Sequence, residues 1–172
     1  MSTVISAPWA RAFAIVTLSA AGLALSGCSL LPSLTGGETA TRDDSGEVVE
    51  GNESTDVFTL QVGDCLNDAT AEDTVETIPT VPCTEPHDSE IYASILMEGD
   101  IFPGTDTVIA EADAACLDAY AAFTGIEYAD SIYYYSYYFP TEGSWEGGDR
   151  EILCTIYDEA GQVTGSLQNI GR

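Results

Sequence analysis

Four cysteines within residues 57–172 place the strongest constraint on how this chain can fold: Cys65, Cys83, Cys116 and Cys154. In a small exported domain, an even number of cysteines predicts disulfides, and four cysteines allow three pairings. The sequence favours Cys65–Cys83 with Cys116–Cys154, because each bond then joins segments expected to be neighbours. On the chain-entropy model, the disulfides that close these two loops would stabilise the fold by about 3 and 4 kcal/mol. Disulfides form only if the chain is exported to an oxidising compartment, and the N-terminal segment indicates whether it is.

The pattern of residues 1–27 predicts a signal peptide. An uncharged run of 14 residues follows Arg11, which suits a secretory signal and is short for a membrane-spanning helix. The run is followed by Ser26-Gly27-Cys28, and together with Leu25 these residues resemble the lipobox of bacterial lipoproteins. The resemblance implies that Cys28 receives diacylglycerol and further acyl chains such as palmitate, which would anchor the chain at the extracytoplasmic face of the cytoplasmic membrane. A plain secretory signal with an incidental cysteine is the alternative.

Residues 28–56 are expected to comprise the lipidated cysteine and a disordered acidic linker. Pro, Gly, Ser and Thr are frequent here, and seven acidic side chains lie between Glu38 and Asp56. Such a composition buries too little apolar surface to offset the entropy of ordering. As a coil of about 5–6 Å × √n, this linker would hold the folded part about 30 Å from the membrane.

The charge balance narrows the classes of partner. The chain has 29 acidic side chains against 4 basic ones, none of them lysine, and a formal charge of −25. A nucleic-acid binder needs a basic face for phosphate, so no nucleic-acid partner is expected. At 172 residues the chain has room for one folded domain besides its N-terminal segments.

Residues 57–172 are predicted to form a small α+β domain, with one main helix packed on an antiparallel sheet. The helix is expected at 105–123, where Gly and Pro are absent, with Thr105, Asp106 or Thr107 as its N-cap. Its core face should carry Ile109, Ala112, Cys116, Tyr120 and Phe123. Extended segments are expected at 57–62, 75–83, 90–97, 132–139, 151–157 and 162–167, the last two forming a hairpin. Pro79 and Pro82 should confine the second segment to a sheet edge or an irregular path.

His87 is the sole histidine, so a general-base or metal hypothesis must involve it. No nucleophile elbow of the Gly-x-Ser-x-Gly type is present, and a turn or strand-edge role for His87 is favoured over catalysis. A zinc site formed by Cys83, His87 and another cysteine is the alternative to a disulfide. No cofactor or metal is expected, because exported thiols tend to oxidise and the sequence has no calcium-binding loop.

Aromatic side chains supply the other candidate binding residues. Successive rings of the strand at 132–139 point to opposite faces, so one set should complete the core. The other set either covers the helix and pairs across strands or faces solvent. Tyr134 and Tyr138, with Trp145 in the following loop, would then be able to stack against a sugar or a peptide. Arg150 stands among acidic residues and is expected to form a local ion pair, with substrate binding as the alternative.

An ordered set of fragments resembles the septum-formation family domain of actinobacterial envelope proteins: Val62-Gly63-Asp64-Cys65, Val81-Pro82-Cys83, Pro86-His87, Glu90-Ile91-Tyr92, Cys116, Trp145, Gly148-Asp149-Arg150 and Cys154. The resemblance spans residues 57–168. It implies a link to cell division at the envelope and supplies no catalytic residue or ligand.

Two functions follow as expectations. The first is a lipid-anchored, non-enzymatic interaction module in envelope growth or septum formation, whose partners are envelope or division proteins. The second is an extracytoplasmic ligand-binding lipoprotein or enzyme that uses His87 or an aromatic surface. A deep pocket that holds His87 beside a carboxylate would favour the second. A shallow surface, with His87 bonded to backbone, would favour the first.

Overall fold

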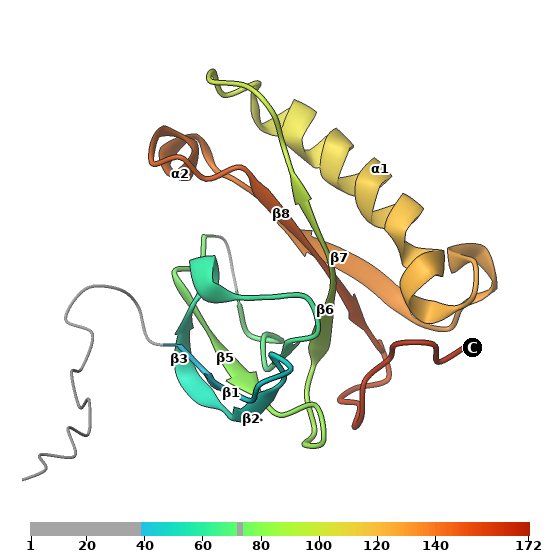
Figure 1. Ribbon diagram of the computed structural model, residues 1–172. Coiled ribbons are helices and arrows are strands. Elements are labelled where there is room, and N and C mark those ends of the chain that lie inside the picture. Colours follow the sequence, from blue (N-terminus) through green and yellow to red (C-terminus); the bar gives the residue numbers. More distant parts are fainter. Residues whose placement is uncertain (1–38, 72–73) are drawn as a thin grey trace, which may run out of the picture. The chain divides into compact units, whose positions relative to one another are not determined.

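The computed structural model describes residues 39–71 and 74–172 (Figure 1). The predicted signal peptide, Cys28 and the first part of the predicted linker lie outside the described residues. In chain order the elements are β1 Thr41–Arg42, β2 Val48–Glu50, β3 Asn52–Asp56, the 3₁₀ helix η1 Val57–Thr59, β4 Cys65–Leu66, β5 Thr77–Val81, β6 Ser89–Leu96, α1 Thr105–Thr124, the 3₁₀ helix η2 Tyr128–Asp130, β7 Tyr134–Tyr138, α2 Glu142–Glu146 and β8 Glu151–Tyr157.

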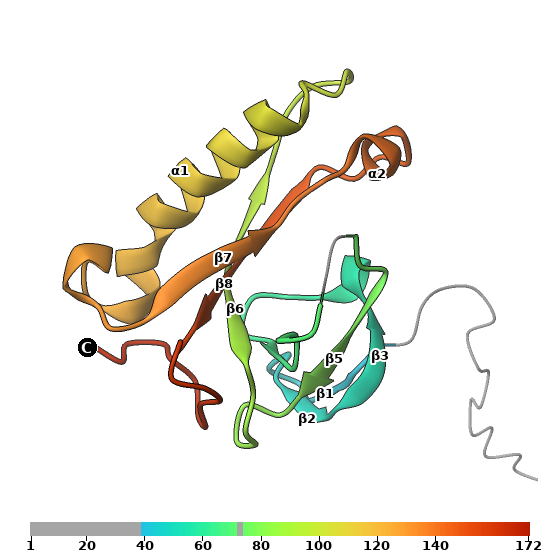
Figure 2. The same ribbon diagram turned by 180° about the vertical axis from the view of Figure 1, so that it is seen from behind.

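Six strands form one antiparallel sheet in the order β3-β5-β4-β6-β8-β7, and β1 pairs with β2 in a separate hairpin. The long helix α1 packs on β6, β7 and β8 (Figures 1 and 2). The predicted α+β fold, with one main helix on an antiparallel sheet, is therefore confirmed.

The apolar side chains form two clusters. The larger lies between α1 and the sheet and includes Tyr92 of β6, Tyr120 of α1 and Ile156 of β8. The smaller contains Leu60, Leu66, Ile78, Ile91 and Leu153. In β6 the register with β8 shifts between Ile91 and Ala93, so Ile91 joins the smaller cluster while Ala93 packs against the larger one. Simple alternation along the strand would place Ile91 and Ala93 on one face, and the bulge divides them.

Helix α1 confirms the predicted span but not its cap. It begins after Gly104, whose φ is 92°, and no side chain caps it; it ends at Gly125, which adopts the left-handed conformation. The buried face contains Val108, whereas Ile109 is 38% exposed. Both residues are apolar, so the pattern alone did not determine which of the two faces the sheet.

Both favoured disulfides are present. Cys65 of β4 is bonded to Cys83, and Cys116 of α1 is bonded to Cys154 of β8. Each sulfur pair is buried. The second disulfide fastens the main helix to the centre of the sheet.

Residues 39–56 differ from the predicted linker. They form β1, β2 and β3, and Val48 is buried. The folded part therefore begins well before residue 57. The prediction was wrong over this range because the composition of the segment gave no sign of the distant polar partners that hold it.

Two predicted strands are also absent. Residues 57–59 form the 3₁₀ helix η1, capped by the Asp56 carboxylate, which accepts from Phe58 N. Residues 162–167 form no strand; instead Val163 makes an isolated bridge with His87. The Asp158 carbonyl and carboxylate accept hydrogen bonds within the turn after β8, which leads the chain toward His87 rather than back along β8.

Strand β5 confirms the extended segment at 75–83 but lies between two neighbours rather than at an edge. Pro79 lacks the N–H group that a central strand would donate. Opposite it, the register between β3 and β5 shifts between Asn52 and Thr55, so a bulge accommodates the proline. The Pro79 carbonyl accepts from Asn67 N at 3.0 Å.

Candidate functional site

His87 is fully buried and bonded to backbone. Its Nδ1 lies 2.9 Å from the Glu85 carbonyl oxygen, and its own backbone exchanges two hydrogen bonds with Val163. Its Nε2 has no partner among the described residues. The ring therefore fastens the turn at Glu85, and the His87 backbone holds the segment after β8, as the favoured turn or strand-edge role implies. His87 does not line the surface groove described below.

The zinc alternative does not fit the structure. Cys83 Sγ is bonded to Cys65 Sγ, so neither sulfur is a thiolate. The two sulfurs and the Glu90 carboxylate do lie within 4.8 Å of one another, and all three residues are buried. A disulfide beside one carboxylate lacks the ligands that a structural zinc ion requires.

Glu90, which the sequence placed in the fragment Glu90-Ile91-Tyr92 and near His87, is a buried carboxylate. Only 1% of the residue is exposed, and its oxygens accept from Ser166 Oγ and from Leu167 N, both at 2.6 Å. Burial raises the pKa of this carboxyl, and the two hydrogen bonds partly oppose that rise. Glu90 thus joins β6 to the C-terminal segment. Its position in a strand gave the only signal, and that signal is weak.

Replacing Glu90 tests this assignment through the pH dependence of stability. A carboxyl whose pKa is raised in the folded state stabilises the fold below its unfolded pKa, and this contribution is lost as the pH rises through the folded pKa. Urea unfolding from about pH 4 to pH 7 should therefore show a smaller fall in the free energy of unfolding for Glu90→Gln than for the wild type. Glu85→Gln, at an exposed carboxylate nearby, is the matched control. Parallel curves for wild type and Glu90→Gln would contradict this role.

Trp145 is buried, and the partly exposed side chain of Arg150 covers it. Trp145 is 2% exposed, and the Arg150 guanidinium carbon lies 3.8 Å from the centre of its ring. The guanidinium donates to the carbonyl oxygens of Gly99, Trp145 and Asp149. Within residues 39–71 and 74–172 it forms no ion pair, so the predicted ion pair is wrong. Its donors bond instead to backbone carbonyls of the β6–α1 loop, of α2 and of the loop between α2 and β8.

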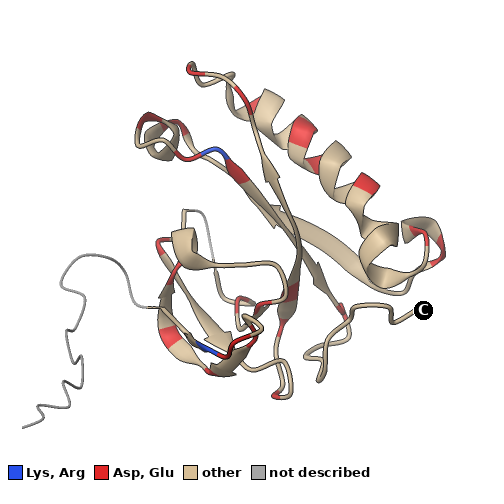
Figure 3. Cartoon of the chain, in the orientation of Figure 1, with Lys and Arg blue, Asp and Glu red and all other residues tan. Residues whose placement is uncertain are grey.

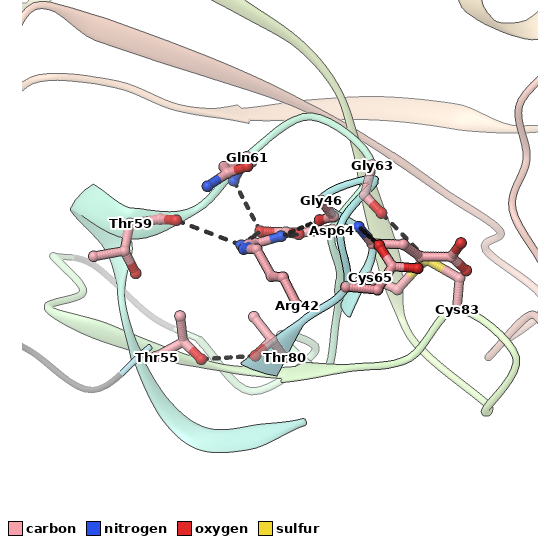
Figure 4. A network of polar contacts seen from close by, with 12 residues as sticks. Arg42, Gly46, Thr55, Thr59, Gln61, Gly63, Asp64, Cys65, Thr80 and Cys83 are labelled. Carbon is pink, nitrogen blue, oxygen red and sulfur yellow. Dashed lines mark hydrogen bonds and ion pairs between the residues drawn. A yellow bond between two sulfur atoms is a disulfide. The ribbon is translucent and has the colours of Figure 1, made fainter. Parts of the chain in front are cut away.

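The ion pair that does form joins Arg42 to Asp64 (Figure 4). Both guanidinium NH₂ groups donate to the Asp64 carboxylate, which also accepts from Gln61 N at 2.8 Å. Asp64 is 1% exposed, and its hydrogen bond raises the pKa of the Arg42 guanidinium. The pair fastens the β1–β2 hairpin to the loop before β4. Sequence reasoning placed Arg42 in a linker and therefore missed it.

A groove of about 490 Å³ opens on the sheet face opposite α1. The register places Tyr134 beside Tyr157 and Ser136 beside Thr155, so these side chains share that face, whereas Tyr135 packs toward α1. We call this site the tyrosine groove and define it by these lining residues: Asp68, Ala69, Ala71, Val75, Asp88, Ser89, Ser136, Tyr137, Tyr138, Thr155, Tyr157, Asp158, Glu159 and Gly161.

The structure brings Tyr134 and Tyr138 to this face but not Trp145. Tyr134 is 39% exposed, and its ring lies 6.0 Å from that of Tyr157 at the groove. Trp145 belongs to the larger cluster between α1 and the sheet. The expected surface contained Tyr134, Tyr138 and Trp145. In the structure, Tyr157 takes the place of Trp145, so the surface contains three tyrosines: Tyr134, Tyr138 and Tyr157.

Asp68 organises the polar part of the groove. One of its oxygens accepts from Ser89 Oγ at 2.8 Å and from Tyr138 Oη at 2.7 Å. Burial and the Asp68 charge raise the pKa of Tyr138, which keeps this phenol protonated as a donor. Asp88, Asp158 and Glu159 add three further carboxylates. Figure 3 shows acidic residues spread over α1, the strands and the loops, with few basic ones.

A family model described as "Septum formation" matches residues 22–154, which is more than half of the chain. The chain belongs to the septum-formation family. The match includes residues 39–56 and every cysteine, and it ends at Cys154. Searches of curated proteins and of solved structures found no significant match. Membership in this family associates the chain with septum formation. Among its described residues, no helix combines the length and apolar character needed to span a bilayer.

Proposed function

We propose that this septum-formation protein is a lipid-anchored, non-enzymatic interaction module at the extracytoplasmic face of the cytoplasmic membrane, and that the tyrosine groove binds its partner. The observation that carries the proposal is the groove itself. It combines partly exposed tyrosine rings with hydroxyl and carboxylate groups, and the exposed ring of Tyr134 lies beside it on the same face of the sheet, as in protein-binding surfaces.

The arrangement of the titratable groups supports binding over catalysis. A hydrolytic site needs a nucleophile, a base within hydrogen-bond reach and a position for substrate. His87 is the only imidazole in the sequence, and it is buried against the Glu85 carbonyl. The serines of the groove, Ser89 and Ser136, have carboxylates and phenols as neighbours but no imidazole among the lining residues.

Anchoring is supported by the sequence alone. Leu25-Ser26-Gly27-Cys28 follows an uncharged run of suitable length, and two or more acyl chains on one residue hold a protein stably at a membrane. The two disulfides agree with an oxidising compartment outside the cytoplasm. The partners proposed are envelope or division proteins.

The test is imaging of a fluorescent fusion in growing cells, combined with crosslinking and pull-down of the full chain. We expect septal enrichment and recovery of division or peptidoglycan-synthesis proteins. Tyr134→Ala should lower that recovery roughly tenfold or more, because an exposed aromatic anchor carries much of an interface's energy. Phe58→Ala, at an aromatic residue that is 64% exposed outside the groove, should leave the recovery unchanged.

The same cells report on anchoring. Cys28→Ala should move the fusion from the membrane fraction to the soluble fraction, because the acyl chains would be lost. Uniform membrane distribution of the wild type, with no crosslinked protein, would overturn the proposed function. Equal recovery with Tyr134→Ala and wild type would show that the aromatic face beside Tyr157, at the edge of the groove, does not bind the partner.

A further inference from the structure

Strand β7 is an open edge of the sheet. It stands last in the strand order and pairs only with β8. Within the described residues, no other segment forms a backbone hydrogen bond with β7. An edge strand presents unpaired N–H and C=O groups, and proteins commonly protect such an edge with lysine, proline or a covering segment. The sequence of β7, Tyr-Tyr-Ser-Tyr-Tyr, contains neither lysine nor proline.

The open edge adjoins the tyrosine groove, whose carboxylates lack a cation. Ser136 and Tyr138 of β7 line the groove together with Asp68, Asp158 and Glu159. The arginines of the described residues bind elsewhere: Arg42 to Asp64, Arg150 to backbone carbonyls and Arg172 to Tyr133 Oη. With no lysine in the chain, the negative field of the groove is not balanced by a neighbouring side chain.

We propose that β7 accepts an extended segment of a partner protein as an added strand, and that Lys or Arg side chains of this segment enter the tyrosine groove. The inference rests on the proposed function and names the chemistry of its partner. In strand addition, main-chain hydrogen bonds supply affinity, and alternate side chains supply specificity. Here those side chains would meet carboxylates and the rings of Tyr134 and Tyr157, which attract cations.

A basic peptide fits these observations better than a neutral glycan does. A glycan would stack on the tyrosine rings, yet it would leave the backbone groups of β7 unpaired. It would also leave the carboxylates of Asp68, Asp88, Asp158 and Glu159 without a counter-charge. A peptide with a cation at every second residue satisfies both requirements, because alternate side chains of a strand point to the same face.

The experiment measures binding of synthetic ten-residue peptides to the purified full chain in detergent micelles. The first peptide alternates Lys and Thr, the second replaces Lys by Glu, and the third is the Lys peptide with alternate backbone nitrogens methylated. We expect the Lys peptide to bind at least about tenfold more tightly than either of the others, and to bind more weakly as salt is added. Equal binding of the methylated peptide would overturn strand addition, and equal binding of the Glu peptide would overturn the cationic specificity.

Charge-matched variants locate the binding site. Asp158→Asn combined with Glu159→Gln should weaken Lys-peptide binding about three- to tenfold. Glu111→Gln combined with Asp118→Asn makes the same change in net charge on the exposed side of α1 and should leave binding unchanged. A photo-crosslinking Lys peptide should label β7 and not β3, which is the other edge of the sheet.

The outcomes separate this inference from the proposed function. Failure of the Lys peptide to bind, or labelling of β3 in place of β7, would overturn the inference alone when crosslinked partners are still recovered at the septum. Absence of any protein partner in cells would overturn the proposed function, and with it the partner inferred here.

Discussion

Removing the disulfide between α1 and the sheet is expected to lower the free energy of unfolding by about 4 kcal/mol. The variant carries Cys116→Ala together with Cys154→Ala, so that neither half leaves a free thiol. The bond closes a loop with a sequence separation of 38 residues, and its loss gives the unfolded chain back that freedom. Urea unfolding followed by circular dichroism, in the absence of reductant, gives the measurement.

The second disulfide provides the matched comparison. Cys65→Ala with Cys83→Ala opens a loop with a separation of 18 residues, for which the same model gives a smaller loss of about 3 kcal/mol. A loss within about 1 kcal/mol of zero for the Cys116 and Cys154 variant would show that this bond does not constrain the unfolded chain as the entropy model requires.

Asp64→Ala is expected to lower the free energy of unfolding by about 3 kcal/mol, and to release the β1–β2 hairpin. The change removes the acceptor of both Arg42 donors and of Gln61 N, and it leaves a mostly buried guanidinium without its counter-charge. The guanidinium keeps some exposure, 16%, so the lower part of the usual range for a broken buried ion pair applies.

Hydrogen exchange checks where this effect falls. Backbone amides of β1 and β2 should exchange much faster in Asp64→Ala, while those of β8 should change little relative to the global loss of stability. Asp44→Ala removes one exposed carboxylate from the same hairpin and should have little effect on either measurement. Unchanged protection of β1 and β2 in Asp64→Ala would show that the ion pair does not hold the hairpin.

Local patterns predicted the parts of the fold that depend on neighbouring residues. The gap between Gly104 and Gly125 contains no helix-breaking residue, so the span of α1 could be predicted from the sequence. The disulfides followed from the same reasoning, because Cys116 lies on the core face of that helix and Cys154 lies in a strand beside it.

Features that depend on distant residues could not be predicted in this way. Arg42 finds Asp64 at a separation of 22 residues, and nothing near Arg42 signals that partner. Pro79 is tolerated between two strands only because β3 bulges opposite it. Trp145 was placed at the surface because it lies in a Gly-rich loop, yet α2 turns it into the larger cluster, where Arg150 covers it.

The early start of the folded part limits how far the groove can reach from the bilayer. With Cys28 as the proposed anchor, only ten residues, 29–38, separate the acyl chains from the first described residue. Even a fully extended chain of about 3.6 Å per residue gives this tether a maximum span of roughly 36–40 Å. Under the proposed function, the folded part would thus stay close to the outer surface of the membrane, and the proposed partner segments would be extracytoplasmic stretches near membrane-embedded helices.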